Sequence, residues 1–305
     1  MQRDKAPFDQ VVILGGAGAM GTLLARQLKQ AGARVLGCDL RSPNHSTDFD
    51  DFVTADVLHP PRERLDEWSR CDVAIVALPH EPALAAIAAL APMLPADALL
   101  VDTLSVKTPV HDLLISRPPR CEYLSINPMF APSLGFAGQS VLAVAERAGP
   151  KSEAFTKLME SWGSTVVLRS AEEHDRLCAV MQTATHLLLL CLGKVMSQSG
   201  VEPADLLAVA PPPHRLCLSL LSRILSGAPE TYWDIQRDNP QAGAIRQQLA
   251  DAIVHFGKQF DSNDAAAFAA TLAEMRQAIA PYLPNLTKSA ADAIRAITPA
   301  SRIPS

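Results

Sequence analysis

The sequence predicts an α/β domain with a mostly parallel sheet over residues 1–168, followed by an all-helical domain over residues 169–305. Three observations support this fold class. Short apolar runs typical of buried strands alternate with helical patterns between residues 10 and 168. A glycine-rich turn follows the first of these runs. From Ser170 onward the helical pattern continues with almost no strand pattern. A chain of 305 residues has enough material for two domains of ordinary size.

The composition is that of a folded globular protein, with 48% apolar and 19% charged residues. The net charge of −5, without a basic cluster, gives no support for binding to nucleic acid or to an anionic membrane. The N-terminal stretch MQRDKAPFDQ lacks the apolar segment of a signal peptide, and the apolar run Leu187–Leu192 is too short to span a bilayer. The six cysteines show no C-x-x-C spacing, and the sequence shows no metal-ligand spacing. We therefore expect a cytoplasmic protein without a metal site.

The first strand and the turn after it have the pattern of a dinucleotide-binding motif. Val11–Leu14 is an apolar run, and Gly16, Gly18 and Gly21 follow it with the spacing G-x-G-x-x-G. In this motif the first glycine permits a tight turn, the second lets the backbone approach a pyrophosphate, and the third lets the helix pack on the strand. The expected helix, Thr22–Gln30, offers its amide-rich N-terminus to the phosphates. The sequence therefore predicts a Rossmann-type dinucleotide-binding domain.

An acidic residue closes the second strand, Arg34–Gly37, of this motif. Asp39 follows the glycines at a spacing where a carboxylate accepts hydrogen bonds from a ribose 2′-hydroxyl and repels a 2′-phosphate. NAD is therefore the expected cofactor, although Arg41 weakens the discrimination against NADP. A later strand, Asp72–Leu78, ends at Pro79 beside the expected cofactor cleft. The expected cofactor-binding residues are Gly16, Gly18, Ala19, Met20, Gly21, Asp39, Leu78 and Pro79.

Further strands and helices complete the predicted α/β domain. The remaining expected elements are the strands Ala98–Asp102, Glu122–Ile126, Val141–Val144 and Thr165–Leu168, and the helices Pro82–Leu90 and Glu153–Ser161. The stretch Ser42–Asp51 is predicted to be a polar loop.

The second half is predicted to be helical throughout. A capping box at Ser170 and Glu173 starts a long helix that extends to about Gln198. Its stretch Leu187–Met196 is apolar almost all round, which predicts burial in a helix bundle or in a subunit interface. The tail after Pro284 is polar and weakly patterned. The other expected helices are one that Pro211–Pro213 opens and that runs through Arg215 to Leu225, followed by Ala242–Phe260 and Asp264–Ala280.

Several separated motifs resemble those of the prephenate/arogenate dehydrogenase family, in the family's order and over nearly the whole chain. They are the glycine loop GGAGAMG, the segment DTLSVK, NPMFAP followed by Gly138-Gln139, the EEHDR run at 172–176, Gln182 with His186, and the HRL run at 214–216. The resemblance implies an NAD(P)-dependent enzyme that removes hydride from C4 of a cyclohexadienol while a ring carboxylate leaves as CO2. It also implies a small-molecule substrate and a homodimer formed through the helical domain.

The resemblance places three residues at the reacting end of the substrate. Ser105 would lie near the nicotinamide and the reacting carbon. Gln182 and His186, which are four residues apart on one helix face, would lie beside the substrate. From the sequence alone, Ser105 could simply cap a helix, and a histidine in an apolar helix is more often a core residue.

The resemblance also suggests a carboxylate anchor. Arg215 is expected to bind a substrate carboxylate, because a guanidinium presents a fork that matches two carboxylate oxygens. Arg223 is the alternative anchor. His174 and Asp175 are candidates for holding the domain junction.

One position departs from the family pattern. The family motif is H-P-M-F-G-P, whose histidine draws the proton from the substrate's 4-hydroxyl, whereas this chain has Asn127 in that place. Asparagine does not titrate, so Asn127 cannot be the general base. Loss of hydride from an alcohol carbon leaves a strongly acidic protonated carbonyl, but loss from an amine-bearing carbon leaves a stable iminium ion. We therefore expect Asn127, Ser105 and His186 to form the catalytic group around an aminated substrate.

Three hypotheses follow for the function. In the first, 4-amino-4-deoxyprephenate is oxidised to 4-aminophenylpyruvate, as in bacterial routes to p-aminophenylalanine and antibiotics built from it. In the second, the chain is a prephenate or arogenate dehydrogenase of tyrosine biosynthesis, and loss of the base costs about 10²–10⁴-fold in rate. In the third, the chain is a catalytically silent NAD-binding sensor. A β-hydroxyacid dehydrogenase is disfavoured, because only Lys194 in the long helix could serve as its catalytic lysine.

Overall fold

The structure is a computed structural model that describes residues 7–297, so most of the N-terminal stretch considered for a signal peptide lies outside it. It separates into two compact units. Unit 1 comprises the chain up to Cys178 together with Arg237–Pro240, and unit 2 comprises Ala179–Gln236 and the chain from Gln241 onward. The boundary therefore lies beyond the expected residue 168. The reason is that helix α6 (Ala171–Cys178) is held to unit 1 by buried hydrogen bonds.

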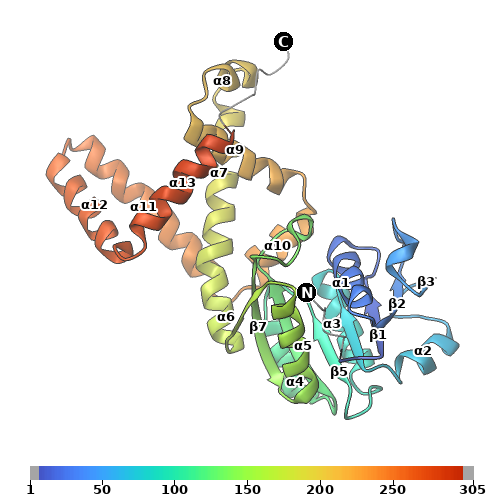
Figure 1. Cartoon of the computed structure of the whole chain (residues 1–305). Helices are drawn as coiled ribbons and strands as arrows, with labels where there is room; N and C mark the ends of the chain where they lie inside the picture. The colour runs from blue at the N-terminus through green and yellow to red at the C-terminus, as the bar shows by residue number, and fades with distance from the viewer. Residues whose placement is uncertain (1–6, 298–305) are drawn as a thin grey trace. The chain divides into compact units, whose positions relative to one another are not determined.

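Unit 1 is built on one eight-stranded sheet with the order β3-β2-β1-β4-β5-β6-β7-β8 (Figure 1). All neighbouring strands run parallel except β6 and β7, which pair antiparallel. The strands are β1 (Gln10–Leu14), β2 (Arg34–Asp39), β3 (Asp51–Thr54), β4 (Val73–Val76), β5 (Leu99–Asp102), β6 (Glu122–Pro128), β7 (Ser140–Arg147) and β8 (Thr165–Leu168). The strand order reverses between β1 and β4, and ligands of such sheets bind at this point.

Helices cover both faces of this sheet, because successive side chains of each strand point to opposite faces. Val11 and Ile13 of β1 pack against one set of helices, and Val12 and Leu14 pack against the other. The first set is α1 (Ala19–Gln30) and α5 (Pro150–Ser161); the second is α2 (Arg62–Trp68), α3 (His80–Leu90) and α4 (Thr108–Ser116). The Rossmann-type fold predicted from the alternating pattern is confirmed.

One strand of unit 1 was not expected from the sequence. The polar loop predicted at Ser42–Asp51 is followed directly by the short edge strand β3. This strand has no buried residue, so it lacks the apolar run that marks the central strands.

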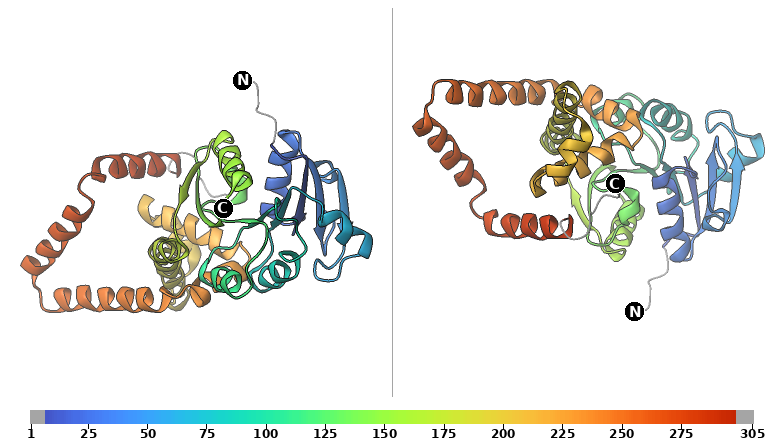
Figure 2. Two further views of the ribbon diagram at one scale, coloured as in Figure 1. Left: turned by 90° about the horizontal axis from the view of Figure 1, so that it is seen from below. Right: turned by 90° about the horizontal axis from the view of Figure 1, so that it is seen from above.

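Unit 2 is helical, as the periodicity predicted. A π-helical segment, Ala179–Ala184, continues from α6 and leads into α7 (Thr185–Gln198). The other helices are α8 (Pro203–Val209), α9 (Pro212–Leu225), α10 (Pro229–Asp238), α11 (Ala242–Asp261), α12 (Ala265–Ile279) and α13 (Leu283–Ile297). Helix α9 packs on α7, and α11 and α13 extend as two arms that α12 joins (Figure 2).

The expectation of a weakly patterned tail after Pro284 is wrong, because helix α13 occupies residues 283–297. Leu286, Ala290 and Ile294 recur at helical spacing, and α13 packs against α9.

The core of unit 2 is small within one chain. The hydrophobic cluster found among its described residues has Leu189, Leu221 and Ile224 as buried members, and Ile235 is buried apart from it. Most of the apolar stretch Leu187–Met196 remains at least partly exposed. By length and composition alone, the continuous helix Ala171–Gln198 could cross a membrane, yet only 22% of its most apolar window is buried within the chain. The apolar surface of this helix therefore needs a covering that a single chain does not provide.

Candidate active site

The turn after β1 is shaped by glycines that leave no room for side chains. Gly15 has a φ of +87°, and a Cβ placed on it would lie 2.2 Å from the carbonyl oxygen of Ala77. A Cβ on Gly21 would lie 2.2 Å from the carbonyl oxygen of Gly15, so this glycine allows α1 to pack on the turn. The role of turn-forming glycine, assigned from the sequence to Gly16, therefore belongs to Gly15.

The N-terminus of α1 is prepared for an anionic group. Its N-cap is Gly18, which has no side chain to satisfy the first amides of the helix. Ala19 and Met20 form the first turn, in which there is no acidic residue. Unsatisfied amides and the positive end of the helix dipole together bind phosphate groups.

Asp39 lies at the end of β2, beside this turn. One of its carboxylate oxygens accepts a hydrogen bond from the backbone N–H of Ala17 at 3.2 Å, and the other accepts from the N–H of Arg41 at 3.1 Å. The guanidinium Nε of Arg41 lies 4.0 Å from the carboxylate. Leu78 follows β4 and lies next to Gly15. The expected cofactor residues therefore gather at the carboxyl ends of β1, β2 and β4, and they fit a dinucleotide.

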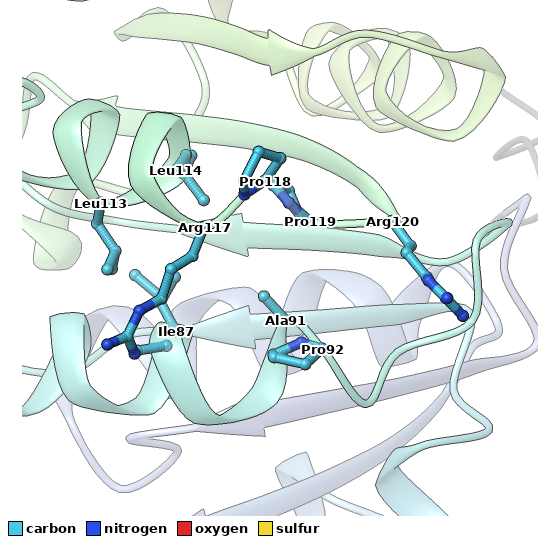
Figure 3. A pocket seen from close by; sticks show the side chains of 10 residues that line it. Ile87, Ala91, Pro92, Leu113, Leu114, Arg117, Pro118, Pro119 and Arg120 are labelled. Atoms are coloured by element: carbon cyan, nitrogen blue, oxygen red, sulfur yellow. The ribbon is translucent and has the colours of Figure 1, made fainter.

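The hollow in Figure 3 is not part of this cofactor site. It has a volume of about 460 Å³ and lies between the C-terminal ends of α3 and α4. Arg117 and Arg120, on its wall, come just before β6 begins at Glu122. The hollow is therefore at the amino ends of the strands, opposite the edge where cofactors bind.

A buried polar cluster surrounds Asn127, near the carboxyl end of β6. The Asn127 side chain is 2% exposed, and its Nδ2 lies 3.1 Å from Nε2 of His174 and 3.5 Å from the carbonyl oxygen of Ser105. The Sγ of Cys178 is also 3.5 Å from Nδ2. The structure thus brings two of the expected catalytic residues, Asn127 and Ser105, into contact within unit 1.

Lys107 holds the segment that carries Ser105. This lysine is fully buried, and its Nζ donates hydrogen bonds to the carbonyl oxygens of Leu104 at 2.5 Å and Ile126 at 2.8 Å. It also pairs with Asp102 at 3.4 Å. Burial lowers the pKa of Lys107, and Asp102 opposes this shift. Because Ile126 precedes Asn127, this lysine ties the Ser105 loop to the strand that presents Asn127.

Asp175 ties α6 to the same loop. Its carboxylate accepts hydrogen bonds from the N–H groups of Lys107 and Thr108, each at 2.8 Å, and from Oγ1 of Thr108 at 2.7 Å. Nδ1 of His174 lies 2.8 Å from the same carboxylate. Burial opposes ionisation of Asp175, but hydrogen bonds from His174, Thr108 and the backbone lower its pKa. Of these two residues, expected at a domain junction, His174 also contacts Asn127, the residue in the place of the family's base, and Asp175 reaches it only through His174.

In unit 2, Gln182 lies within the π-helical segment and His186 lies in the first turn of α7. Oε1 of Gln182 and Nδ1 of His186 are buried and have no hydrogen-bond partner among the described residues. The ring of His186 meets Tyr232 edge-on, with centroids 5.0 Å apart. Burial, and then the charge of Arg223, lower the pKa of His186. Unpaired buried polar atoms and a π-helical turn both occur often at functional sites.

Arg215 donates hydrogen bonds to backbone carbonyl oxygens of unit 2. Its Nε donates to the carbonyl oxygen of Ala210 at 2.9 Å, and its Nη2 donates to that of Leu207 at 3.3 Å. These carbonyls lie at the C-terminal end of α8, where a cation stabilises the helix. The anchoring role expected of Arg215, with Arg223 as the alternative, stays a prediction.

Sequence reasoning also missed the part played by His174 and Cys178 beside Asn127. Their contacts join residues far apart in the chain, and no local pattern marks them. The EEHDR run was noticed, but nothing in it indicates a partner in β6.

The glycine turn, the acid that ends β2 and the buried polar cluster at the carboxyl edge define a dinucleotide-dependent oxidoreductase. Family models match two stretches of the chain. The nucleotide-binding domain of prephenate dehydrogenase matches residues 24–142, and the dimerization domain of prephenate dehydrogenase matches residues 170–274.

Relatives cover nearly the whole chain. A 4-amino-4-deoxyprephenate dehydrogenase of Streptomyces pristinaespiralis is 38% identical over 90% of this chain and 92% of its own length. The T-protein of Haemophilus influenzae is 27% identical over 92% of this chain and 69% of its own length. The crystal structure of prephenate dehydrogenase from A. aeolicus in complex with hydroxyphenyl propionate and NAD+ has a TM-score of 0.68 at 19% identity, covering 88% of this chain and 96% of that one.

The chain belongs to the prephenate dehydrogenase family. The expectation of an NAD-dependent dehydrogenase of the prephenate type is thereby confirmed at the level of the family, and unit 2 carries the family's dimerization domain.

Proposed function

We propose that this enzyme catalyses the NAD-dependent oxidative decarboxylation of 4-amino-4-deoxyprephenate to 4-aminophenylpyruvate. The observation that carries the proposal is Asn127, an amide in the place of the family's proton-accepting histidine. The similarity to the Streptomyces pristinaespiralis protein of that name supports it.

The chemistry explains why an amide suffices. Loss of hydride from C4 of the neutral amine gives an iminium cation, and release of the C1 carboxylate as CO2 returns the electron pair to the ring and yields the neutral aniline. No proton must leave during these two steps. With a 4-hydroxyl, loss of hydride would leave a strongly acidic protonated carbonyl, so a general base that draws on the hydroxyl proton lowers the barrier and contributes about 10²–10⁴-fold.

The cofactor proposed is NAD rather than NADP. When bound, NAD supplies the hydride acceptor. Gly15 and Gly21 keep the turn clear of side chains, the N-terminus of α1 binds the phosphates, and Asp39 accepts hydrogen bonds from the ribose. The proposed cofactor contacts include Gly16, Gly18, Ala19, Met20, Leu78 and Pro79.

Substrate-binding roles are proposed as follows. Ser105 and Asn127 face the reacting carbon, and Gln182 and His186 use their unpaired polar atoms to position the substrate. Arg215 binds a substrate carboxylate, a role for which Arg223 is the second candidate. His186, held neutral by burial, can donate or accept a hydrogen bond.

The enzyme is further proposed to be a cytoplasmic homodimer. The dimerization domain and the exposed apolar side chains of α7 support association of two copies. A second copy would cover Leu188 and Val195, which are 54% and 66% exposed in one chain.

The test offers prephenate and 4-amino-4-deoxyprephenate separately to the purified enzyme with NAD, and it follows NADH by absorbance. Preferential turnover of the amine is the expected result. Efficient turnover of prephenate would show that another group does the work of the histidine and would indicate tyrosine biosynthesis. Binding of NAD without turnover of either substrate would indicate a sensor.

A further inference from the structure

The chain Asp175–His174–Asn127 ends on the residue that distinguishes this protein from its family. We infer that His174 and Asp175 are positioning residues that lock the amide of Asn127 with its Oδ1 turned toward the substrate amine. The inference deepens the proposed function and rests on it for the identity of the substrate.

The first step concerns the proton on His174. Nδ1 of this histidine lies 2.8 Å from the carboxylate of Asp175, which is an acceptor only when ionised. The carboxylate also takes three hydrogen bonds from Lys107 and Thr108, and donors of this kind keep it ionised. The proton of the neutral imidazole therefore resides on Nδ1.

The second step concerns the other ring nitrogen. His174 is fully buried, and burial lowers its pKa, so the ring is neutral at physiological pH. With the proton on Nδ1, Nε2 carries only a lone pair. The atom of Asn127 that lies 3.1 Å away must then be a donor, which is Nδ2.

Other neighbours of Asn127 agree with this assignment. The carbonyl oxygen of Ser105, 3.5 Å from Nδ2, can only accept a hydrogen bond. The Cys178 thiol lies 3.5 Å from Nδ2 and 3.6 Å from Nε2 of His174, and burial raises its pKa to about 12, so it remains protonated. Because a thiol can accept as well as donate, it is compatible with this orientation but does not select it. A reversed amide would set Oδ1 against the lone pair on Nε2 of His174 and against the Ser105 carbonyl. Both contacts would pair an acceptor with an acceptor.

The orientation leaves Oδ1 of Asn127 as the group available to a ligand. Among the described residues no hydrogen bond reaches this oxygen, and it is not one of the buried side-chain atoms without a partner, so it is not sealed in the core. An amide oxygen accepts a hydrogen bond from the 4-amine, and that bond strengthens as the nitrogen becomes a cationic iminium. The opposite orientation would point N–H groups at this cation.

If the inference is correct, replacing His174 slows the chemical step only when Asn127 is present. His174→Phe removes the acceptor that locks the amide, and kcat for the amine should fall about 10- to 100-fold with little change in KM, the range expected for losing a hydrogen bond to a developing charge. In an Asn127→Ala background the same His174→Phe change should have little further effect. An equal loss in both backgrounds would mean that His174 is only structural, and would overturn the inference.

A matched control is His111→Phe. His111 also pairs with a carboxylate in unit 1, with Nδ1 2.8 Å from Glu146, but it does not contact Asn127. Its replacement should leave kcat unchanged.

If His174→Phe fails to fold, the protonation of His174 in the unaltered enzyme can test the inference instead. Nitrogen-15 NMR of histidine-labelled protein reports which ring nitrogen of His174 is protonated. A proton on Nδ1 supports the inference, and a proton on Nε2 contradicts it, since Nε2 would then donate to Asn127 and reverse the amide. This measurement needs no substrate, so its outcome is independent of whether the enzyme prefers the amine to prephenate.

Discussion

The two units of the chain differ in how far their apolar side chains are buried and in whether their buried polar groups have partners. In unit 1, two apolar clusters seal both faces of the sheet, and the buried groups Lys107, His174 and Asp175 all have partners. In unit 2, the hydrophobic cluster among the described residues has only Leu189, Leu221 and Ile224 as buried members, and large apolar side chains such as Leu188 and Val195 are more than half exposed.

The difference indicates how the two units reach a stable state. Unit 1 contains its own core and holds its site residues rigidly through charges and hydrogen bonds. Unit 2 presents apolar surface that a second copy would cover, and the buried orphan atoms of Gln182 and His186 are suited to a ligand. The hydrophobic core of unit 1 is closed within one chain, whereas the apolar surface of unit 2 needs a second copy to cover it.

The largest expected effect tests whether the unit 1 site alone selects the substrate. Asn127→His is expected to raise turnover of prephenate by about 10²–10⁴-fold, because Nε2 of His174 can accept from one imidazole nitrogen and leave the other as a base. Steady-state kinetics with both substrates measure it. Asn127→Ala serves as the control and should gain nothing on prephenate. If Asn127→His also gains nothing, our account of this position is wrong.

The second prediction tests the rigidity of unit 1. Lys107→Met should lower the free energy of unfolding by about 3–5 kcal/mol, because it leaves Asp102 buried without its cation. Denaturant unfolding measures the change. In the control, Lys151→Met breaks the more exposed pair with Asp72 and should cost below about 1 kcal/mol. Equal losses from the two variants would contradict the difference that we draw between buried and exposed pairs.

The third prediction tests the incompleteness of unit 2. Replacing both Leu188 and Val195, seven residues apart on one face of α7, with Glu should convert a dimer to a monomer, since two desolvated charges oppose association. Analytical ultracentrifugation measures the mass. The control is Gln248→Glu on the exposed surface of α11, which should remain a dimer. A double variant that is still dimeric would show that this face of α7 is not in the interface.

The fourth prediction concerns the cofactor. Asp39→Asn should weaken the preference for NAD over NADP by about 10- to 100-fold, because the variant loses the charge that repels a 2′-phosphate. Its single amide oxygen can keep only one of the two backbone contacts that the carboxylate accepts, from Ala17 and from Arg41. The ratio of kcat/KM with the two cofactors measures it. An unchanged ratio would indicate that Arg41, rather than Asp39, sets the preference.

The smallest effect is a pH dependence shared by the two units. Burial lowers the pKa of His174 in unit 1 and of His186 in unit 2, so the unfolded chain binds more protons as the pH falls below about 6.5. The free energy of unfolding is therefore at its full value above this pH and decreases on acidification, because protons bind to these histidines more readily in the unfolded chain. Unfolding of His186→Gln, compared with the parent at about pH 5 and about pH 7, should show a smaller pH effect. A difference equal to that of the parent would show that His186 does not contribute.

Much of the fold could be predicted because it depends on local patterns. The buried parallel strands are continuous apolar runs, and the glycine turn and Asp39 lie within one strand–helix–strand stretch. The edge strand β3 was missed because it is marked by pairing with β2 rather than by a buried apolar run. Helix α13 was missed although its apolar residues recur at helical spacing, because polar residues around them made the stretch look weakly patterned.

The features of the candidate site also divide into those that the sequence predicts and those that only the tertiary structure shows. The sequence by itself determined that the chain binds a dinucleotide and that Asn127 cannot act as a base, because these follow from spacing and from side-chain chemistry. Only the tertiary structure decided that His174 faces Asn127, that Lys107 ties the Ser105 loop to β6, and that Arg215 donates to the end of α8. The physical reason is that a hydrogen bond requires two groups within about 3 Å and correctly aligned, and for residues far apart in the chain only packing brings them there.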